Sequence, residues 1–304
     1  MRTTALAVVG PTGVGKTAVA ARVAAAIGGE IVSIDSRQVY RGLEICTNAP
    51  TAKELGGVRC HLVGCLQPGE KLDAARYVSL ARPIIDDLRR HGRVPVLTAG
   101  TGLYLKALLE GLDLGGHAAD PQLRAELEKE AERDLGGLYV RLAGIDPEAA
   151  VRVEPTNRVR VVRATELALR RQRGDQPETA GWAPLAAIKV GLTAPRAELY
   201  EWIEVRTDRL LSRGWRAEVE ALLDTGVDLS STALSSIGLR EMAACIQGRA
   251  SMEAVRAAII KRTRNYAKRQ LTWFRADPEV RWLDVTCYSE SDIVEPILEM
   301  LERP

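Results

Sequence analysis

The segment from Gly10 to Thr17 constrains the fold of this chain more than any other part of its sequence. It reads Gly-Pro-Thr-Gly-Val-Gly-Lys-Thr and fits the phosphate-loop pattern G-x-x-x-x-G-K-[ST]. An apolar run at residues 6–9 predicts a buried strand before it, and an Ala-rich stretch at 17–27 predicts a helix after it. A glycine-rich turn in that context binds phosphate groups, because its backbone N–H groups point inward and the helix N-terminus adds positive potential.

The chemistry of this loop is that of polyphosphate binding. Lys16 is expected to place its charge on the outer phosphate, and Thr17 to offer its hydroxyl to Mg²⁺, the predicted cofactor. A nucleotide hydrolase also needs a strand that ends in an acidic residue, but the strand predicted at 94–98 is followed by Ala99 and Gly100. Asp35, at the end of a strand predicted at 30–34, could serve as a metal ligand or as a base. The candidate diphosphate-binding residues are Gly10, Pro11, Thr12, Gly13, Val14, Gly15, Lys16 and Thr17.

Strands and helices alternate through most of the chain. Short apolar runs predict further strands at 30–34, 94–98, 187–192 and 280–283. Helical spacing predicts helices at 73–91, 103–109, 196–213, 216–223, 240–247, 252–275 and 290–302. This alternation indicates an α/β fold, a P-loop NTPase-like parallel sheet flanked by helices.

The character of the sequence changes after Gly111. Residues 113–173 are strongly charged and helical in pattern, without a convincing strand, and glycines stand at both edges. We therefore expect an inserted all-helical subdomain at 113–183. The remaining segments, 1–112 and 184–304, are expected to form the catalytic core.

Composition limits the class of protein. The chain has 42 basic and 40 acidic residues, so its net charge of +2 gives no indication of a nucleic-acid partner. The distribution does, because the basic residues cluster in two stretches. Its 5 cysteines are scattered and odd in number, which favours a reducing cytoplasm over a disulfide framework. No apolar run approaches the roughly 18–20 residues of a membrane span, and the first run leads straight into Gly10. We predict no membrane association and no signal peptide.

Four further stretches narrow the function. They are Asp35-Ser36-Arg37-Gln38-Val39-Tyr40, Gly-Thr-Gly-Leu-Tyr-Leu-Lys-Ala-Leu at 100–108, Ser-Ile-Gly-Leu-Arg-Glu at 236–241, and Thr-Arg-Asn-Tyr-Ala-Lys-Arg-Gln-Leu-Thr-Trp-Phe-Arg at 263–275. With the phosphate loop, and in this order, they resemble the tRNA dimethylallyltransferases, also called tRNA isopentenyltransferases. The resemblance implies transfer of a dimethylallyl group from dimethylallyl diphosphate to N6 of the adenosine 3′-adjacent to the anticodon. The implied partner is the tRNA anticodon stem-loop, and the enzyme is expected to be a monomer.

The chain departs from the family pattern at three places. Ala49 stands where the family commonly has Lys, Gly64 where it commonly has an acid, and Ala99 where it commonly has Gly. We expect the first two changes to affect acceptor fit and rate more than the class of reaction.

The implied reaction needs a base and a stabilised leaving group. The exocyclic amine of adenine is a poor nucleophile, because its lone pair is delocalised into the ring. The resemblance assigns the role of base to Asp35, and it assigns Thr101 to hold the same amine and a diphosphate oxygen. Arg206 resembles the family arginine that clamps the diphosphate, since a guanidinium grips such oxygens with two donors. Arg209 is a rival for that role.

Two basic stretches are expected to contact RNA. The predicted helix at 252–275 interleaves cations with Tyr266 and Trp273, which suits a phosphate backbone and unstacked bases. Residues 157–161 resemble the family segment that meets the anticodon arm. Residues 36–38 directly follow Asp35, the candidate proton acceptor that the flipped adenosine must reach. The candidate tRNA-binding residues are Asp35, Ser36, Arg37, Gln38, Thr101, Arg124, Asn157, Arg158, Val159, Arg160, Val161, Ile237, Gly238, Arg240, Arg264, Lys268, Arg269, Gln270 and Arg275.

Three other functions fit parts of the same sequence. An adenylate isopentenyltransferase would keep the fold and take a free adenine nucleotide as acceptor. A nucleotide kinase would use the Arg-bearing insert as a lid over the phosphates. A non-catalytic, P-loop-containing RNA-binding module would keep its function in an Asp35→Ala variant. The basic helix and the insert favour a tRNA acceptor, because a free nucleotide needs neither.

Overall fold

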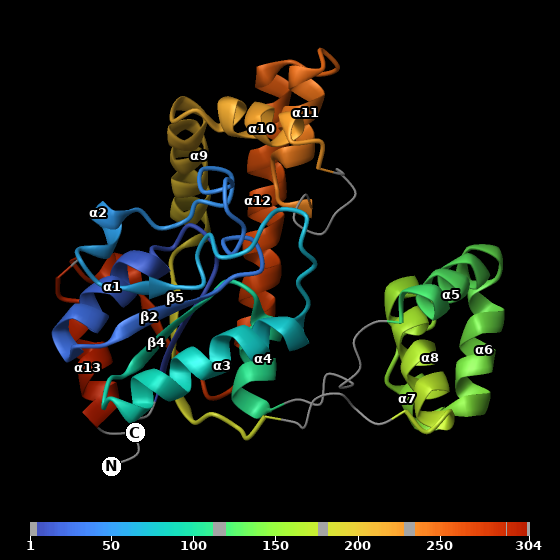
Figure 1. Cartoon of the computed structure of the whole chain (residues 1–304). Helices are drawn as coiled ribbons and strands as arrows, with labels where there is room; N and C mark the ends of the chain where they lie inside the picture. Colours follow the sequence, from blue (N-terminus) through green and yellow to red (C-terminus); the bar gives the residue numbers. More distant parts are fainter. Residues whose placement is uncertain (1–4, 112–119, 176–181, 228–234, 290, 303–304) are drawn as a thin grey trace. The chain divides into compact units, whose positions relative to one another are not determined.

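Two compact units make up the structure, a computed structural model that describes residues 5–111, 120–175, 182–227, 235–289 and 291–302. Residues 1–110 and 184–304 form unit 1, and residues 111–183 form unit 2. The sequence analysis placed the first of these boundaries at residue 113. Figure 1 labels the helices and strands of both units.

Unit 1 is built on a six-stranded sheet in the order β3-β2-β4-β1-β5-β6. All the neighbouring strands run parallel, so each connection crosses over the sheet, mostly through a helix. The expected fold class is therefore confirmed. The strands are β1 (Ala5–Val9), β2 (Glu30–Ile34), β3 (Cys60–His61), β4 (Pro95–Ala99), β5 (Ala187–Thr193) and β6 (Arg281–Asp284).

Strand β3 is the element of the sheet that the sequence pattern does not reveal. It has only two residues, which pair with Ile31 and Val32 of β2. His61 Nε2 lies 2.6 Å from Glu30 Oε2, and Arg93 pairs with the other oxygen of that buried carboxylate. Two residues carry no periodicity, so distant partners and not a local pattern decide the structure of this strand.

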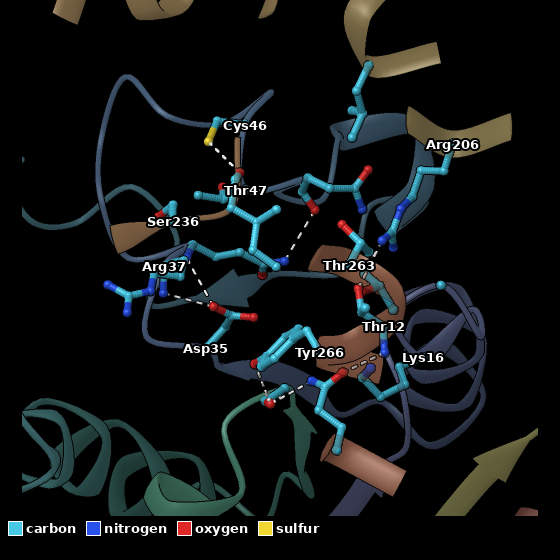
Figure 2. A pocket seen from close by; sticks show the side chains of 18 of the residues that line it. Thr12, Lys16, Asp35, Arg37, Cys46, Thr47, Arg206, Ser236, Thr263 and Tyr266 are labelled. Carbon is cyan, nitrogen blue, oxygen red and sulfur yellow. Dashed lines mark hydrogen bonds between the residues drawn. The ribbon is translucent and has the colours of Figure 1, made fainter. Parts of the chain in front are cut away.

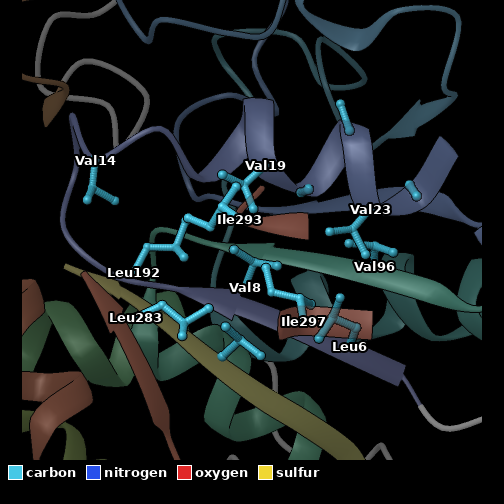
Figure 3. Close-up of a cluster of buried hydrophobic side chains, with 14 of the residues drawn as sticks. Leu6, Val8, Val14, Val19, Val23, Val96, Leu192, Leu283, Ile293 and Ile297 are labelled. Carbon is cyan, nitrogen blue, oxygen red and sulfur yellow. The ribbon is translucent and has the colours of Figure 1, made fainter. Parts of the chain in front are cut away.

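The two faces of the sheet are covered by different helices. Leu6 and Val8 share a buried cluster with residues of α1 (Lys16–Ile27) and α13 (Val294–Glu302), as Figure 3 shows. The alternating residues of β1 point to the opposite face. Helix α3 (Ala74–Arg90) contacts β2 and β4, and its Tyr77 stacks on Tyr104 of α4 (Gly102–Glu110).

The last helix starts later than the predicted range of 290–302. Its first residue is Val294, because Ser289 closes a turn ahead of it. The Ser289 carbonyl accepts from Ile293 N, and its hydroxyl accepts from Asp292 N. Residue 290 lies outside the described residues.

Four helices of unit 1 lie between β5 and β6 in the described part of the chain. Helices α9 (Arg196–Ser212) and α12 (Met252–Arg275) lie side by side. Helices α10 (Trp215–Asp224) and α11 (Leu239–Ile246) pack together, with α11 against α12 (Figure 1). Among the described residues, no helix is long and apolar enough to cross a membrane. The short elements α2 (Ala52–Leu55) and the 3-10 turn η2 (Val285–Cys287) complete unit 1.

Unit 2 is all helical in the part that is described. Four polar side chains, Asp120, Asp134, Asp146 and Asn157, accept backbone N–H groups and cap its helices. Its interior is a separate core that includes Leu127, Leu138 and Leu142. The helices are α5 (Pro121–Arg133), α6 (Leu135–Ile145), α7 (Pro147–Val151) and α8 (Arg158–Gln172).

Removing the carboxylate of Glu166 is expected to destabilise unit 2. This side chain is fully buried and accepts from Arg124, Arg163 and the backbone of Asp120. The substitution Glu166→Ala removes the acceptor that these donors share and should cost about 2 kcal/mol, because both arginines remain partly hydrated. Urea unfolding measures the loss. As a matched control, Glu132→Ala removes the exposed partner of Arg158 and should cost about 0.5 kcal/mol or less. Equal losses in the two variants would contradict this assignment.

Candidate active site

A cavity of about 600 Å³ lies in unit 1 where strands β1, β2 and β4 end. In a parallel sheet the carboxyl ends of the strands converge on a ligand crevice, so the loops that follow them supply the lining. Helices α9 and α12 and the segment 235–237 close the remaining sides. Figure 2 shows Lys16 and Arg206 in one part of this cavity and Asp35, Arg37 and Ser236 in another.

The phosphate loop takes its shape from glycine. Gly10, Gly13 and Gly15 all have φ between 91° and 138°, a region that disfavours other residues. A Cβ at Gly10 would lie 2.4 Å from the carbonyl oxygen of Leu192, so the loop also needs a glycine for close packing on β5. The ammonium of Lys16 turns into this loop and donates to the carbonyls of Gly10 and Pro11, both at 2.9 Å.

Burial changes the acidity of Lys16. It lowers the pKa of this ammonium to about 7, an effect that Asp35 opposes and Arg206 reinforces. The unbound protein therefore loses this charge as the pH rises through neutrality. An incoming diphosphate would draw the proton back, because its charge stabilises the ammonium.

Diphosphate binding should consequently weaken above about pH 7. Binding to the deprotonated protein requires uptake of a proton, and this requirement can cost up to about tenfold in affinity per pH unit. Titration calorimetry with inorganic diphosphate in two buffers of different ionisation heat measures the uptake. The variant Lys16→Met keeps the protonation of diphosphate itself but should lack the additional uptake. Identical pH profiles for the two proteins would refute this account.

Arg206 lies beside the same loop. Its Nη2 donates to the Thr12 hydroxyl at 3.0 Å, and burial, aided by the nearby charge of Arg209, lowers the pKa of its guanidinium to about 10. Arg209 is exposed, although it also borders the cavity. The cavity therefore presents two enclosed cations, Lys16 and Arg206, next to backbone N–H groups of the loop.

Asp35 is held at the end of β2 by the backbone that follows it. Its Oδ1 accepts from Arg37 N at 2.8 Å and from Gln38 N at 3.3 Å. Its Oδ2 packs against Gly100, where a Cβ would lie 2.7 Å away. The carboxylate is thus fixed in orientation, and Asp35 faces the cavity that contains the phosphate loop.

Thr101 follows β4 and contacts the segment after Asp35. Its Oγ1 accepts from Ser36 N at 3.1 Å, and its own backbone N–H donates to Ile34 O. The adjoining Gly100 carbonyl accepts from Tyr266 Oη at 2.9 Å and from Gln270 Nε2 at 2.7 Å. Tyr266 and Gln270, on successive turns of α12, thereby hold the Gly100–Thr101 segment that supports Asp35.

The structure brings several of the candidate RNA-contacting residues to the cavity. Ser36, Arg37, Gln38, Ile237 and Arg269 all line it. Arg269 also stacks over Tyr266 at 5.7 Å, while Lys268 and Arg275 are exposed and border a second hollow between α9 and α12. Arg240 is exposed at the start of α11.

Other candidates have structural partners inside the protein. Gln270 is buried and bonds within unit 1, which is a correction to its placement among the direct RNA contacts. Gly238 is also buried. Only glycine fits there, because a Cβ would lie 2.3 Å from the Trp215 ring and the φ of 96° favours glycine. Gly238 is the N-cap of α11. Arg264 pairs with Glu204 and stacks over Tyr200 at 4.8 Å, so its guanidinium is already engaged.

The candidates in unit 2 also include both exposed residues and residues with partners inside the protein. Val161 is fully buried in the core of this unit, so its placement among RNA contacts is wrong. Asn157 caps α8 by accepting from Arg160 N, and Arg158 pairs with Glu132. Val159, which is 78% exposed, and Arg160 face outward. Helical geometry explains the division, because residues 161, 162 and 165 share the inward face.

The three departures from the family pattern fit their surroundings. Ala49 is buried and donates its backbone N–H to Glu44 O. Gly64 has φ of 57°, and Ala99 is a buried residue of β4.

A divalent cation would have to share its ligands with a substrate. The described residues hold no group of three His, Cys, Asp or Glu side chains that could bind a metal alone. Thr17 lies at the start of α1 and lines the cavity beside Lys16. One hydroxyl together with diphosphate oxygens and water suits Mg²⁺, which retains much of its hydration.

Some residues that line the cavity were not among the candidate site residues. Thr263 and Tyr266 line the cavity from α12, and Trp215 does so from α10. Tyr266 was expected to contact RNA, and the signal for Thr263 was available, because residues 262, 263, 266, 269 and 270 follow helical spacing and form a polar stripe. Only the tertiary structure places Trp215 at the cavity, where its ring packs against Gly238.

The chain matches sequence models of two related families. The model described as IPP transferase matches residues 38–277, and the one described as isopentenyl transferase matches residues 3–68. The tRNA dimethylallyltransferase of Syntrophobacter fumaroxidans is 42% identical over 285 residues, which cover 91% of this chain and 82% of that protein. The tRNA dimethylallyltransferase of Thermomicrobium roseum is 40% identical over 300 residues, or 98% of this chain and 90% of that protein.

A solved structure agrees over the whole length. The tRNA isopentenylpyrophosphate transferase of Bacillus halodurans superimposes with a TM-score of 0.73 at 36% sequence identity. The alignment covers 99% of this chain and 97% of that chain.

Proposed function

The chain belongs to the IPP transferase family, and we propose from that premise that it transfers a dimethylallyl group to a tRNA. The donor is dimethylallyl diphosphate, and the acceptor is N6 of the adenosine 3′-adjacent to the anticodon. The observation that carries this proposal is the meeting of Asp35 with the phosphate loop in one cavity. A kinase or hydrolase needs the loop, but an oriented carboxylate beside Gly100 and Thr101 suits removal of a proton from a nucleophilic amine.

The residues support a single displacement at the allylic carbon. A bond forms between N6 of the adenosine and the first carbon of the dimethylallyl group, while the bond from that carbon to the diphosphate oxygen breaks. Asp35 takes the proton that the amine loses, and its fixed carboxylate has Oδ2 next to the Gly100–Thr101 turn. The electron pair of the broken bond leaves with the diphosphate, where Lys16, Arg206 and the N–H groups of the loop balance its charge.

Mg²⁺ is proposed to accompany the donor. When bound, it neutralises charge on the diphosphate oxygens, and the Thr17 hydroxyl is the protein group placed to reach it. The residues of the chain orient the diphosphate and hold the base, whichever waters complete the coordination.

The RNA is proposed to approach along exposed basic residues of unit 1 and unit 2. Arg269, Lys268 and Arg275 on α12, and Arg160 on α8, offer charge to phosphates. Ser36, Arg37 and Gln38 line the cavity next to Asp35, where an extruded base must lie.

A prenyl-transfer assay tests the proposal. Protein, Mg²⁺ and dimethylallyl diphosphate are mixed with an anticodon stem-loop that carries adenosine 3′ of the anticodon, and mass spectrometry detects one added dimethylallyl group. AMP and ATP serve as competing acceptors. A prenylated nucleotide with unmodified RNA would instead indicate an adenylate isopentenyltransferase, and phosphate transfer without prenylation would indicate a kinase.

A further inference from the structure

The side chain of Gln270 joins the two halves of the cavity. It is 4% exposed and lies on the face of α12 that borders the site. Its Oε1 accepts from Thr12 N in the phosphate loop at 2.7 Å, and its Nε2 donates to Gly100 O at 2.7 Å. The Gln270 amide thus accepts from one loop through its oxygen and donates to the other through its nitrogen. Replacing either of these atoms would lose a hydrogen bond.

Each of these two loops holds residues with a different role in the proposed reaction. Thr12 also accepts from Arg206 through its hydroxyl, so the phosphate-loop end of the bridge includes this half-buried guanidinium. Gly100 is in contact with Asp35 Oδ2 and precedes Thr101, so the other end includes the base. Figure 2 shows the hydrogen bond that Thr12 N donates within this bridge, and the bond that Tyr266 donates to the same Gly100 carbonyl.

We propose that Gln270 is a positioning residue, which fixes the spacing between the site of the departing diphosphate and the site of the attacking amine. This inference rests on the proposed transfer reaction. A displacement needs the amine and the allylic carbon within about 3–3.5 Å, and an error of about 1 Å can cost about 100-fold in rate. Gln270 controls that distance without touching either reacting atom.

Two substitutions separate this role from an RNA contact. Gln270→Met keeps the volume and removes both bonds, and should lower kcat about 10- to 100-fold. The KM values for dimethylallyl diphosphate and for RNA should change by less than about threefold, because the side chain binds neither substrate. Gln247→Met makes the same chemical change at an exposed position after α11 and should leave kcat unaltered.

Gln270→Glu provides the sharper test. A carboxylate still accepts from Thr12 N but repels the Gly100 carbonyl, whereas a neutral carboxyl restores the missing donor. Burial raises the pKa of the introduced carboxyl, so protonation should occur near the assay range. The ratio of variant to wild-type kcat should rise about tenfold or more as the pH falls from about 8 to about 6. Gln270→Met should show no such recovery.

Single-turnover rates, with circular dichroism to verify folding, distinguish the outcomes. Loss of kcat in Gln270→Met and acid recovery in Gln270→Glu support the proposal. A kcat within about twofold of wild type, a change in the KM for RNA alone, or a flat pH ratio would overturn it. Failure of the wild-type protein to prenylate RNA would instead reject the proposed function.

Discussion

The substitution Asp35→Asn is expected to lower the rate of prenyl transfer by about 10³-fold or more. Asparagine keeps an oxygen that can accept from Arg37 N and Gln38 N, so the turn after β2 should persist. It cannot take a proton from the amine, and the reaction then lacks its base. Single-turnover prenylation of the stem-loop, followed by mass spectrometry, measures the loss.

The control for this prediction is binding. Asp35→Asn should still bind inorganic diphosphate, because Lys16, Arg206 and the N–H groups of the phosphate loop stay in place (Figure 2). A variant that binds normally and transfers at more than about a tenth of the wild-type rate would show that another group removes the proton.

Arg206→Met should produce the second large effect, a loss of about 10²–10³ in kcat/KM for dimethylallyl diphosphate. The guanidinium is enclosed and bonded to Thr12, so its charge acts on a leaving group in a medium with little water. Arg209→Met is the matched comparison on the same helix. Its side chain is exposed, and solvent screening should limit the loss to a few fold.

The comparison decides between the two arginines that the sequence offered as the diphosphate clamp. Steady-state kinetics over a range of donor concentrations, with the RNA saturating, give both constants. A larger loss in Arg209→Met than in Arg206→Met would reverse the assignment.

Local patterns were sufficient for much of the fold. The strand–loop–helix of the phosphate loop was predicted within one residue at each boundary, because its glycines and its apolar runs act over a few neighbouring residues. Strand β3 was missed for the opposite reason, since Glu30, His61 and Arg93 come together only when β2 and β3 are side by side. Val161 belongs to a basic stretch in the sequence, yet the helical period turns it into the core of unit 2.

The sequence by itself determined the phosphate-binding chemistry, the parallel α/β class and the family, because each depends on residues at fixed short spacing. Only the tertiary structure decided which arginine is enclosed beside Thr12 and which side chains hold Asp35 and Thr101 in place. It also decided that Gln270 bridges Thr12 and Gly100 rather than facing RNA. These outcomes depend on burial and on partners that are 65 to 258 residues apart in the chain, and no local pattern encodes such contacts.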